Sequence, residues 1–320
     1  MSASGGTKAI IAAFLANTGI ALTKFIAWFF SGSASMLAEG VHSVADAGNQ
    51  LLLILGGRKA KKAADKEHPF GYGRERYVYA FVVSIILFSV GGIFSIYEGV
   101  DKLTHPHELE NAWLPLLVLS IAIVLESFSL RTAVKESNHI RGRQSWVQFV
   151  RRAKAPELPV VLLEDVAALI GLVFAFLAVG LTVITGNPLF DAIGTLMIGT
   201  LLVVVAIVLG IETKSLLVGE GANDDDLERI EQAILAGPEA ERIIHMKTLY
   251  LGPDELLIAA KIGFTADQRL LEVSAATNVI EQRIRAAVPS ARAIYIEPDV
   301  YVDPNLAAPP TDAIVIKGLE

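Results

Sequence analysis

The sequence predicts an α-helical membrane protein with six transmembrane helices and a small α+β domain at its C-terminal end. Of the 320 residues, 53% are hydrophobic and only 19% are charged, and the mean hydropathy is +0.51. This composition is too apolar for an ordinary soluble domain. The apolar residues are grouped into blocks long enough to cross a bilayer, whereas the last part of the chain is polar and has the pattern of short strands and amphipathic helices.

Six apolar segments mark the predicted transmembrane helices. They cover about residues 8–30, 34–57, 77–100, 112–134, 158–184 and 189–212. Lys and Arg residues gather in the loops after the second and fourth spans, so the positive-inside rule makes these loops and both termini cytoplasmic. No targeting peptide is evident before the first span, and we expect a bacterial plasma membrane. Asn17, a polar residue of the first span, is expected to hydrogen-bond to a neighbouring helix.

A polar domain follows the last span. We predict a transmembrane domain over residues 1–212, a cytoplasmic domain over 213–302 and a tail over 303–320. The acidic run that begins at Asp224 favours a helix start, because carboxylates stabilise the N-terminal end of the helix dipole. The pattern then predicts a helix, two strands, a helix and a last strand, over about 224–236, 243–251, 255–264, 267–287 and 291–298. The order αββαβ indicates a small ferredoxin-like domain.

Three ionisable residues lie on one face of the second predicted helix. At about 100° per residue, Glu39, His42 and Asp46 fall within roughly 60° of one another, so their side chains can converge. One ionisable group within a transmembrane helix costs about 2.5–3.5 kcal/mol on insertion scales. Three on one face therefore indicate a site that a ligand or a partner helix compensates. The sequence has no cysteine, so His, Asp, Glu and neutral oxygens are the available metal ligands.

The six spans, the αββαβ domain and the HxxxD motif of the second span together resemble the cation diffusion facilitator family of divalent-metal/proton antiporters. The resemblance covers nearly the whole chain and rests on the segments SASMLAEGVHSVAD (33–46), HPFGYGRER (68–76) and LLEDVAALIG (162–171). It implies a secondary transporter rather than an enzyme, with Zn²⁺ as the first choice of substrate and no organic cofactor. It also implies a homodimer through the C-terminal domain, in a lipid bilayer and without a nucleic-acid partner.

The resemblance implies a transport site between the second and fifth spans, near the middle of the membrane, where each helix gives two ligands at i and i+4. His42 and Asp46 match this pattern in the second span, and Asp165 matches it in the fifth. The residue four positions before Asp165 is Val161, which has no donor atom. Glu164 lies about 100° around the helix from Asp165 and can reach the same cavity. Glu164, Glu39 and water therefore all stay candidates for the fourth ligand.

Such a site exchanges metal for protons, because the ligands must lose their protons before a metal can bind. His42 is the natural group to exchange a proton near neutral pH, and rocking of helix groups around the site would give alternating access. Imidazole with carboxylates fits Zn²⁺, whereas an oxygen-rich set leans toward Fe²⁺, Mn²⁺ or Co²⁺, which stay alternative substrates. An alternative of another class is a membrane-anchored metal sensor or scaffold without transport.

The loop after the second span contains a candidate second metal site that is weaker than the first. Asp65, Glu67 and His68 have a suitable spacing, but Tyr72 stands where the resemblance implies a second histidine. A basic loop with a glycine-rich turn against the lipid headgroups is favoured instead.

The predicted C-terminal domain has fewer metal ligands than the resemblance implies. His245 is at a matching position, but Lys261 stands where a second histidine is expected. Glu297 and Asp299 are interpreted as a solvated acidic strand end. We therefore expect a dimerisation domain that binds little or no metal and packs across a two-fold axis.

Overall fold

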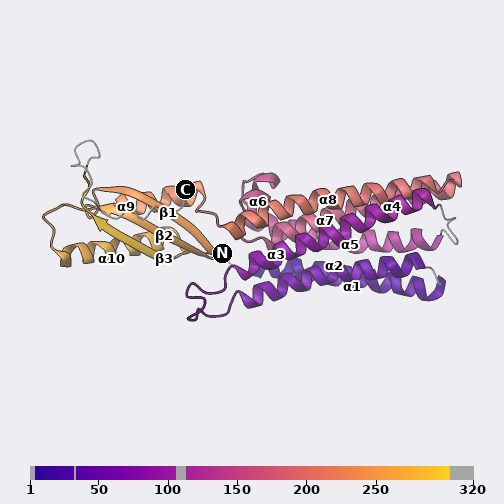
Figure 1. Ribbon diagram of the computed structural model, residues 1–320, viewed down its shortest axis with the longest axis horizontal. Coiled ribbons are helices and arrows are strands. Elements are labelled where there is room, and N and C mark those ends of the chain that lie inside the picture. Colours follow the sequence, from indigo (N-terminus) through magenta and orange to yellow (C-terminus); the bar gives the residue numbers. More distant parts are fainter. Residues whose placement is uncertain (1–3, 32–33, 106–112, 303–320) are drawn as a thin grey trace. The chain divides into compact units, whose positions relative to one another are not determined.

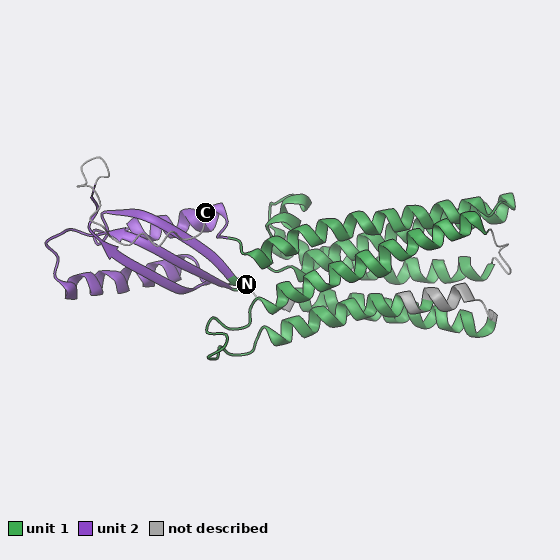
Figure 2. Ribbon diagram, viewed as in Figure 1, with its two compact units in different colours: residues 1–220, 251–254 green, residues 221–250, 255–320 purple. Residues whose placement is uncertain are grey.

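The computed structural model describes residues 4–31, 34–105 and 113–302, apart from the side chains of residues 4–5, 31, 34–39 and 41–42. The chain divides into two compact units, residues 1–220 with 251–254 and residues 221–250 with 255–320 (Figure 2). The predicted domain boundary after residue 212 falls inside the last long helix of the first unit. The predicted tail, 303–320, lies outside the described residues.

The first unit is a bundle of long helices that run along one another (Figure 1). Its elements are α1 (Ser4–Ser31), α2 (Ala34–Lys59), α3 (Glu75–Ile86), the π-helical segment η1 (Leu87–Ile93), α4 (Phe94–Thr104), α5 (Trp113–Arg141), α6 (Trp146–Arg152), α7 (Glu157–Thr185) and α8 (Leu189–Val218). α3, η1 and α4 form one continuous helix. Five helices of the described chain are long and apolar enough to cross a membrane: α1, the continuous helix α3–η1–α4, α5, α7 and α8.

α2 corresponds to the remaining predicted span. Its 26 residues extend about 39 Å at 1.5 Å per residue, which is long enough to cross a membrane. It packs against α1 and α3, but polar residues such as Asn49 and Gln50 make it less apolar than the other five helices. The crossing of α2 stays a prediction that its length and its packing favour.

Of the long helices, α5 and α8 continue furthest beyond the ends that hydropathy predicts. α5 extends to Arg141 and α8 to Val218, beyond the predicted ends at residues 134 and 212. These extensions are polar or amphipathic, so a hydropathy pattern does not detect them. Lys135, which follows the predicted end of the fourth span, therefore lies on α5. The short helix α6 follows, and a capping box at Ser145 fixes its beginning.

The apolar core of the bundle lies toward one end. It is formed by the N-terminal halves of α1, α7 and the α3–α4 helix and by the C-terminal halves of α2, α5 and α8. Its buried side chains include Ala13, Leu53, Val83, Val161 and Leu209. These small and branched residues allow close approach of the helices. A cavity lies toward the other end, where α7 is connected to α8.

The second unit has the predicted order αββαβ. Its elements are α9 (Asp224–Leu235), β1 (Arg242–Gly252), β2 (Glu255–Gly263), α10 (Leu270–Ala287) and β3 (Ala291–Asp299). The sheet order is β1-β2-β3, and β3 runs parallel to β2, which requires the crossover through α10. Ile258 and Ile262 of β2 are buried with Ile230 of α9 and Ile280 of α10. The predicted fold class, a helical membrane protein with a small α+β domain, is therefore confirmed.

Candidate metal-transport site

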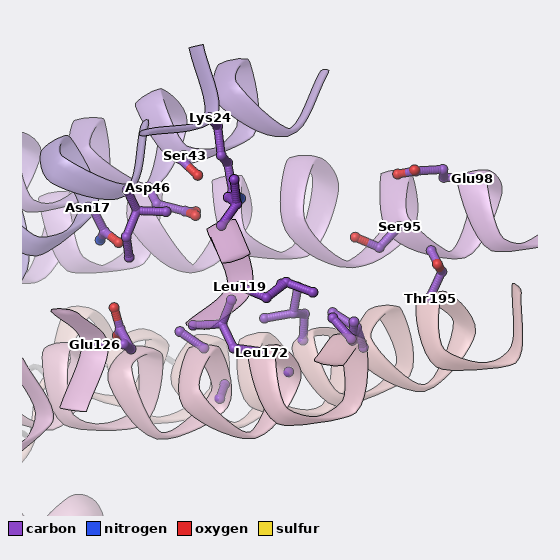
Figure 3. Close-up of a pocket in the computed structure, with 18 of the residues that line it drawn as sticks. Asn17, Lys24, Ser43, Asp46, Ser95, Glu98, Leu119, Glu126, Leu172 and Thr195 are labelled. Carbon is purple, nitrogen blue, oxygen red and sulfur yellow. The ribbon is translucent and has the colours of Figure 1, made fainter. Parts of the chain in front are cut away.

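A cavity of about 230 Å³ lies inside the helix bundle (Figure 3). It extends from the middle of the helices toward the end opposite the apolar core, and α1, α2, the α3–α4 helix, α5, α7 and α8 all line it. Six carboxyl and two ammonium groups belong to its lining residues: Asp46, Glu98, Glu126, Glu164, Asp165, Asp191, Lys24 and Lys102. Acidic groups are thus concentrated in a space that apolar and uncharged polar residues otherwise border.

Two of the predicted ligands line this cavity from different helices. Asp46 lies in the middle of α2, and Asp165 lies in the first half of α7, where it is 1% exposed. The hydroxyl of Ser129 on α5 donates a hydrogen bond to Oδ2 of Asp165 over 2.7 Å. This bond fixes the orientation of the carboxylate in the cavity. The fold therefore brings Asp46 and Asp165, which are far apart in the sequence, to the same space.

Glu164, the neighbour of Asp165, has protein partners on both oxygens. Asn49 donates to Oε1 and Gln50 donates to Oε2, each over 3.1 Å, and both amides belong to α2. The Gln50 carbonyl in turn accepts a hydrogen bond from Asn17 of α1 over 3.4 Å. The interhelical hydrogen bond predicted for Asn17 is therefore confirmed. Glu164 is part of a buried polar network that joins α1, α2 and α7.

The side chains of Glu39 and His42 lie outside the part of the chain that the structure describes. Their backbone is helical within α2, one or two turns from Asp46, so the three residues belong to one helix face. Among the described side chains, no group of three or more His, Cys, Asp or Glu residues is arranged closely enough to hold a metal ion. The roles of His42 and Glu39 stay predictions.

Glu126 of α5 is a cavity residue that the motif analysis does not identify. It is 1% exposed, and Figure 3 shows it on the wall opposite Asp46. Its carboxyl group interacts with the Asp165 side chain. The sequence does contain a signal, since Glu126 is the only charged residue between Trp113 and Leu130, and an ionisable residue within an apolar span indicates a functional site. The i, i+4 pattern concerns the second and fifth spans and so does not reach α5.

Lys102 of α4 contacts polar groups of α4 and α8 at the other end of the cavity. Its Nζ lies 3.3 Å from Oε1 of Glu98 and 3.1 Å from Oδ2 of Asp191. It also donates a hydrogen bond to Oγ1 of Thr195 over 3.2 Å. Because Asp191 and Thr195 belong to α8, the lysine joins α4 to α8. Two carboxylates around one ammonium group keep this end of the cavity acidic as well.

In the loop after α2, Asp65 is engaged by other protein groups. Lys62 and the Tyr72 hydroxyl donate to its Oδ2 over 2.9 and 2.7 Å, and the His68 backbone N–H donates to its Oδ1 over 2.8 Å. The hydrogen bonds from Lys62 and Tyr72 hold the pKa of Asp65 well below its usual range. Asp65 and the His68 ring are neighbours, with 3.7 Å between Oδ1 and Nδ1. A metal ion bound there would have to replace the Lys62 ammonium group.

In the second unit, Lys261 pairs with candidate metal-binding carboxylates, as Lys62 does with Asp65. It lies opposite Glu297 in the β2–β3 register, and its Nζ is 3.0 Å from Oε1 of Glu297 and 2.8 Å from Oδ2 of Asp299. Hydrogen bonds to Asp299 and Glu297 raise the pKa of Lys261, and the bond from Lys261 lowers the pKa of Asp299. Glu297 and Asp299 thus lie at an exposed strand end, as interpreted, and both pair with the Lys261 ammonium group.

Comparison with known proteins gives a match over most of the chain. The model of the cation efflux transmembrane domain matches residues 10–218. The mitochondrial proton-coupled zinc antiporter SLC30A9 of Xenopus laevis is 34% identical over 267 residues, which are 82% of this chain and 48% of that protein. Metal tolerance protein C4 of Arabidopsis thaliana is 30% identical over 80% of this chain and 57% of its own length. The cation-efflux pump FieF of Cronobacter sakazakii is 25% identical over 95% of this chain and 94% of its own. The chain spans about half the length of the SLC30A9 relatives it matches.

Proposed function

Because the chain belongs to the cation efflux family, we propose that it is a secondary transporter that exports divalent metal ions, with Zn²⁺ as the first substrate, in exchange for protons. It is an integral, multi-pass membrane protein. The choice of zinc is supported by the SLC30A9 relatives, whose name describes proton-coupled zinc antiport, and by the metal tolerance and cation-efflux relatives.

In this proposal the ion binds between α2 and α7, with His42, Asp46 and Asp165 as ligands, while Glu164, Glu39 and water are candidates for the remaining place. The observation that supports the site most directly is that Asp46 and Asp165 line the same buried cavity. Carboxylates are costly inside a membrane and are retained there when they serve an ion or proton pathway. A set of one imidazole and carboxylates matches the nitrogen and oxygen donors that Zn²⁺ takes in proteins.

Proton exchange follows from the chemistry of the ligands. The side chains must be deprotonated when they bind the metal, so entry of the ion expels protons from the site. When the ion leaves on the other side, the same side chains take up protons again. One set of groups thus binds the two substrates in turn, which is the requirement for antiport.

Alternating access is supported by the position of the cavity relative to the apolar core of the bundle. The apolar core closes one end, and the cavity extends from the acidic residues toward the other. Rocking of helix groups about the site would open the core end and close the cavity end. With both termini on the cytoplasmic side, as the Lys and Arg distribution favours, this conformation is open toward the opposite face of the membrane. We further propose that the C-terminal domain forms a homodimer.

The test is transport by the purified protein in proteoliposomes, with one dye for zinc and one for pH. Asp46→Ala and Asp165→Ala should abolish zinc-driven proton movement, whereas Asp267→Ala, at an exposed turn in the second unit, should leave it unchanged. Wild-type flux in both cavity variants would show that the site is elsewhere. A wild-type protein that moves neither zinc nor protons would favour the membrane sensor or scaffold.

Iron(II), Mn²⁺ and Co²⁺ are the alternative substrates, since oxygen donors outnumber nitrogen donors in the proposed set. Competition of these ions with Zn²⁺ in the same flux assay decides between them. Stronger inhibition of flux by Mn²⁺ than by Co²⁺ would indicate that the carboxylates dominate the selectivity.

A further inference from the structure

One buried carboxyl group of the cavity lies outside α2 and α7, the two helices of the proposed site. Glu126 lies near the middle of α5 and is 1% exposed. The buried face of α5 otherwise presents small residues to the bundle, among them Ala122, Ser129 and Ala133. Packing alone would favour an apolar residue at the centre of such a face, rather than a glutamate. Its burial in a membrane helix therefore points to a ligand.

The neighbours of Glu126 are acidic. Asp46, Glu164 and Asp165 line the same cavity, and the Glu126 carboxyl interacts directly with Asp165. In the described part of the chain, no amide, hydroxyl or cationic group donates a hydrogen bond to Glu126. Carboxyl groups packed together in this way repel one another once they are ionised, and a divalent cation among them removes the repulsion.

Glu164, unlike Glu126, accepts hydrogen bonds from protein amides. Both of its oxygens accept hydrogen bonds from α2 amides, 3.1 Å from Asn49 and 3.1 Å from Gln50. Recruiting Glu164 to a metal ion would leave these buried amide donors without partners, at a cost of about 1–3 kcal/mol for each. Glu164 therefore fits a structural role, holding α7 against α2, whereas no amide donor in the described part of the chain would lose its partner if Glu126 bound an ion.

We propose that Glu126 is the fourth protein ligand of the transported ion, together with His42, Asp46 and Asp165. This inference rests on the proposed function. The ion would draw these groups together across the cavity from α2, α5 and α7, since Asp46 and Glu126 lie on opposite walls (Figure 3). Four protein ligands complete a tetrahedral shell for Zn²⁺. Ser129, one turn from Glu126 on α5, orients the Asp165 carboxylate through the 2.7 Å hydrogen bond.

The position on α5 has a consequence for selectivity. Three carboxylates and one imidazole form an oxygen-rich site, and oxygen donors favour hard ions over soft ones. Replacing the Glu126 carboxylate with an amide removes one negative charge while keeping the size of the side chain. Affinity for Mn²⁺ should then fall more than affinity for Zn²⁺, because the imidazole contributes more to zinc binding.

The test compares Glu126→Gln with Glu164→Gln in the purified full-length protein, using isothermal titration with Zn²⁺. We expect Glu126→Gln to weaken binding by about tenfold or more. Glu164→Gln should keep the affinity within about twofold and lower the thermal unfolding temperature instead. Equal affinity of Glu126→Gln and wild type would overturn the assignment of Glu126, and tenfold loss in Glu164→Gln alone would assign the ligand to Glu164.

A second measurement does not depend on affinity. Co²⁺ bound to the protein has a visible absorption spectrum that reports its ligands, and Glu126→Gln should change this spectrum whereas Glu164→Gln should not. Asp46→Ala separates this inference from the proposed function. If Asp46→Ala abolishes Zn²⁺ binding and Glu126→Gln leaves binding and the Co²⁺ spectrum unchanged, the site stands and Glu126 is not a ligand. If Asp46→Ala also has no effect, the proposed site itself is wrong.

Discussion

The Nζ atom of Lys102 on α4 lies 3.1 Å from Oδ2 of Asp191 on α8, and this ion pair joins two helices of the cavity wall. Lys102→Met should destabilise the bundle because it leaves Asp191 and Glu98 without their shared cation. Asp191→Asn combined with Lys102→Met should be less harmful than the two single effects added together, with a coupling of about 0.5–3 kcal/mol. Unfolding of the four proteins in detergent micelles measures this coupling. Strict additivity would mean that the pair contributes nothing.

Ser129 and Ser137 provide a matched test of how α5 supports the site. Both are buried on the same face of α5, but the Ser129 hydroxyl donates to Asp165 whereas the Ser137 hydroxyl has no hydrogen-bond partner among the described residues. Ser129→Ala should weaken Zn²⁺ affinity by about tenfold, as the loss of a group that orients a metal ligand does. Ser137→Ala should leave the affinity unchanged. Titration with Zn²⁺ checks both, and equal effects of the two substitutions would contradict the role of Ser129.

Close contact between α8 and the α3–α4 helix gives a prediction about packing. A Cβ atom added at Gly199 would lie 2.7 Å from the backbone nitrogen of Ile96, whereas one added at Gly210 would meet only the Ser84 hydroxyl at 3.6 Å. Gly199→Ala should therefore lower the free energy of unfolding by about 1–3 kcal/mol. Gly210→Ala, on the same helix, should be close to neutral. Thermal unfolding of the two variants in the same detergent is the measurement, and similar unfolding temperatures would contradict the close approach of the two helices at Gly199.

The β2–β3 ion pair makes the C-terminal domain sensitive to acid. Because Lys261 lowers the pKa of Asp299, the stabilisation is present above the ordinary Asp pKa of about 3.9 and is lost as the pH falls through the lowered folded-state pKa. The pKa of Lys261 is raised, so the stabilisation that its charge contributes is lost as the pH rises, and only in strong base. Lys261→Met should make protection of the β2 and β3 amides less dependent on acid pH. Hydrogen exchange of the full-length protein at several pH values tests this, with Arg269→Met as an exposed control.

Hydropathy predicts the long helices well because the bilayer imposes their length and composition. It fails where a helix leaves the apolar region, which explains the unexpected continuation of α5 to Arg141 and of α8 to Val218. Local capping decides other ends. α10 begins at Leu270 rather than at residue 267, because the Glu272 carboxylate accepts a hydrogen bond from the Arg269 backbone N–H over 2.8 Å and fixes the first turn there.

The candidate site is only partly predictable for a different reason. Spacing within one helix relates His42 to Asp46, and the family pattern adds Asp165, but neither says which face of a third helix looks inward. A membrane helix that is apolar all round gives little periodic signal, so the inward position of Glu126 depends on the packing of α5 against α1 and α7. The same holds for Asn49 and Gln50, whose bonds to Glu164 need α2 and α7 to be adjacent.

The charge of the cavity bears on the chemical form in which the metal arrives. Carboxyl groups on its lining outnumber ammonium groups six to two, and they are distributed from Glu126 and Asp165 in the middle of the bundle to Glu98 and Asp191 near its end. A negative potential along this whole path attracts cations and repels anions. In the proposed transport, hydrated divalent ions would therefore be admitted, whereas the same metals held by citrate, phosphate or other anionic chelators would be repelled. Chelators of this kind would act as inhibitors of transport even where the total metal concentration is high.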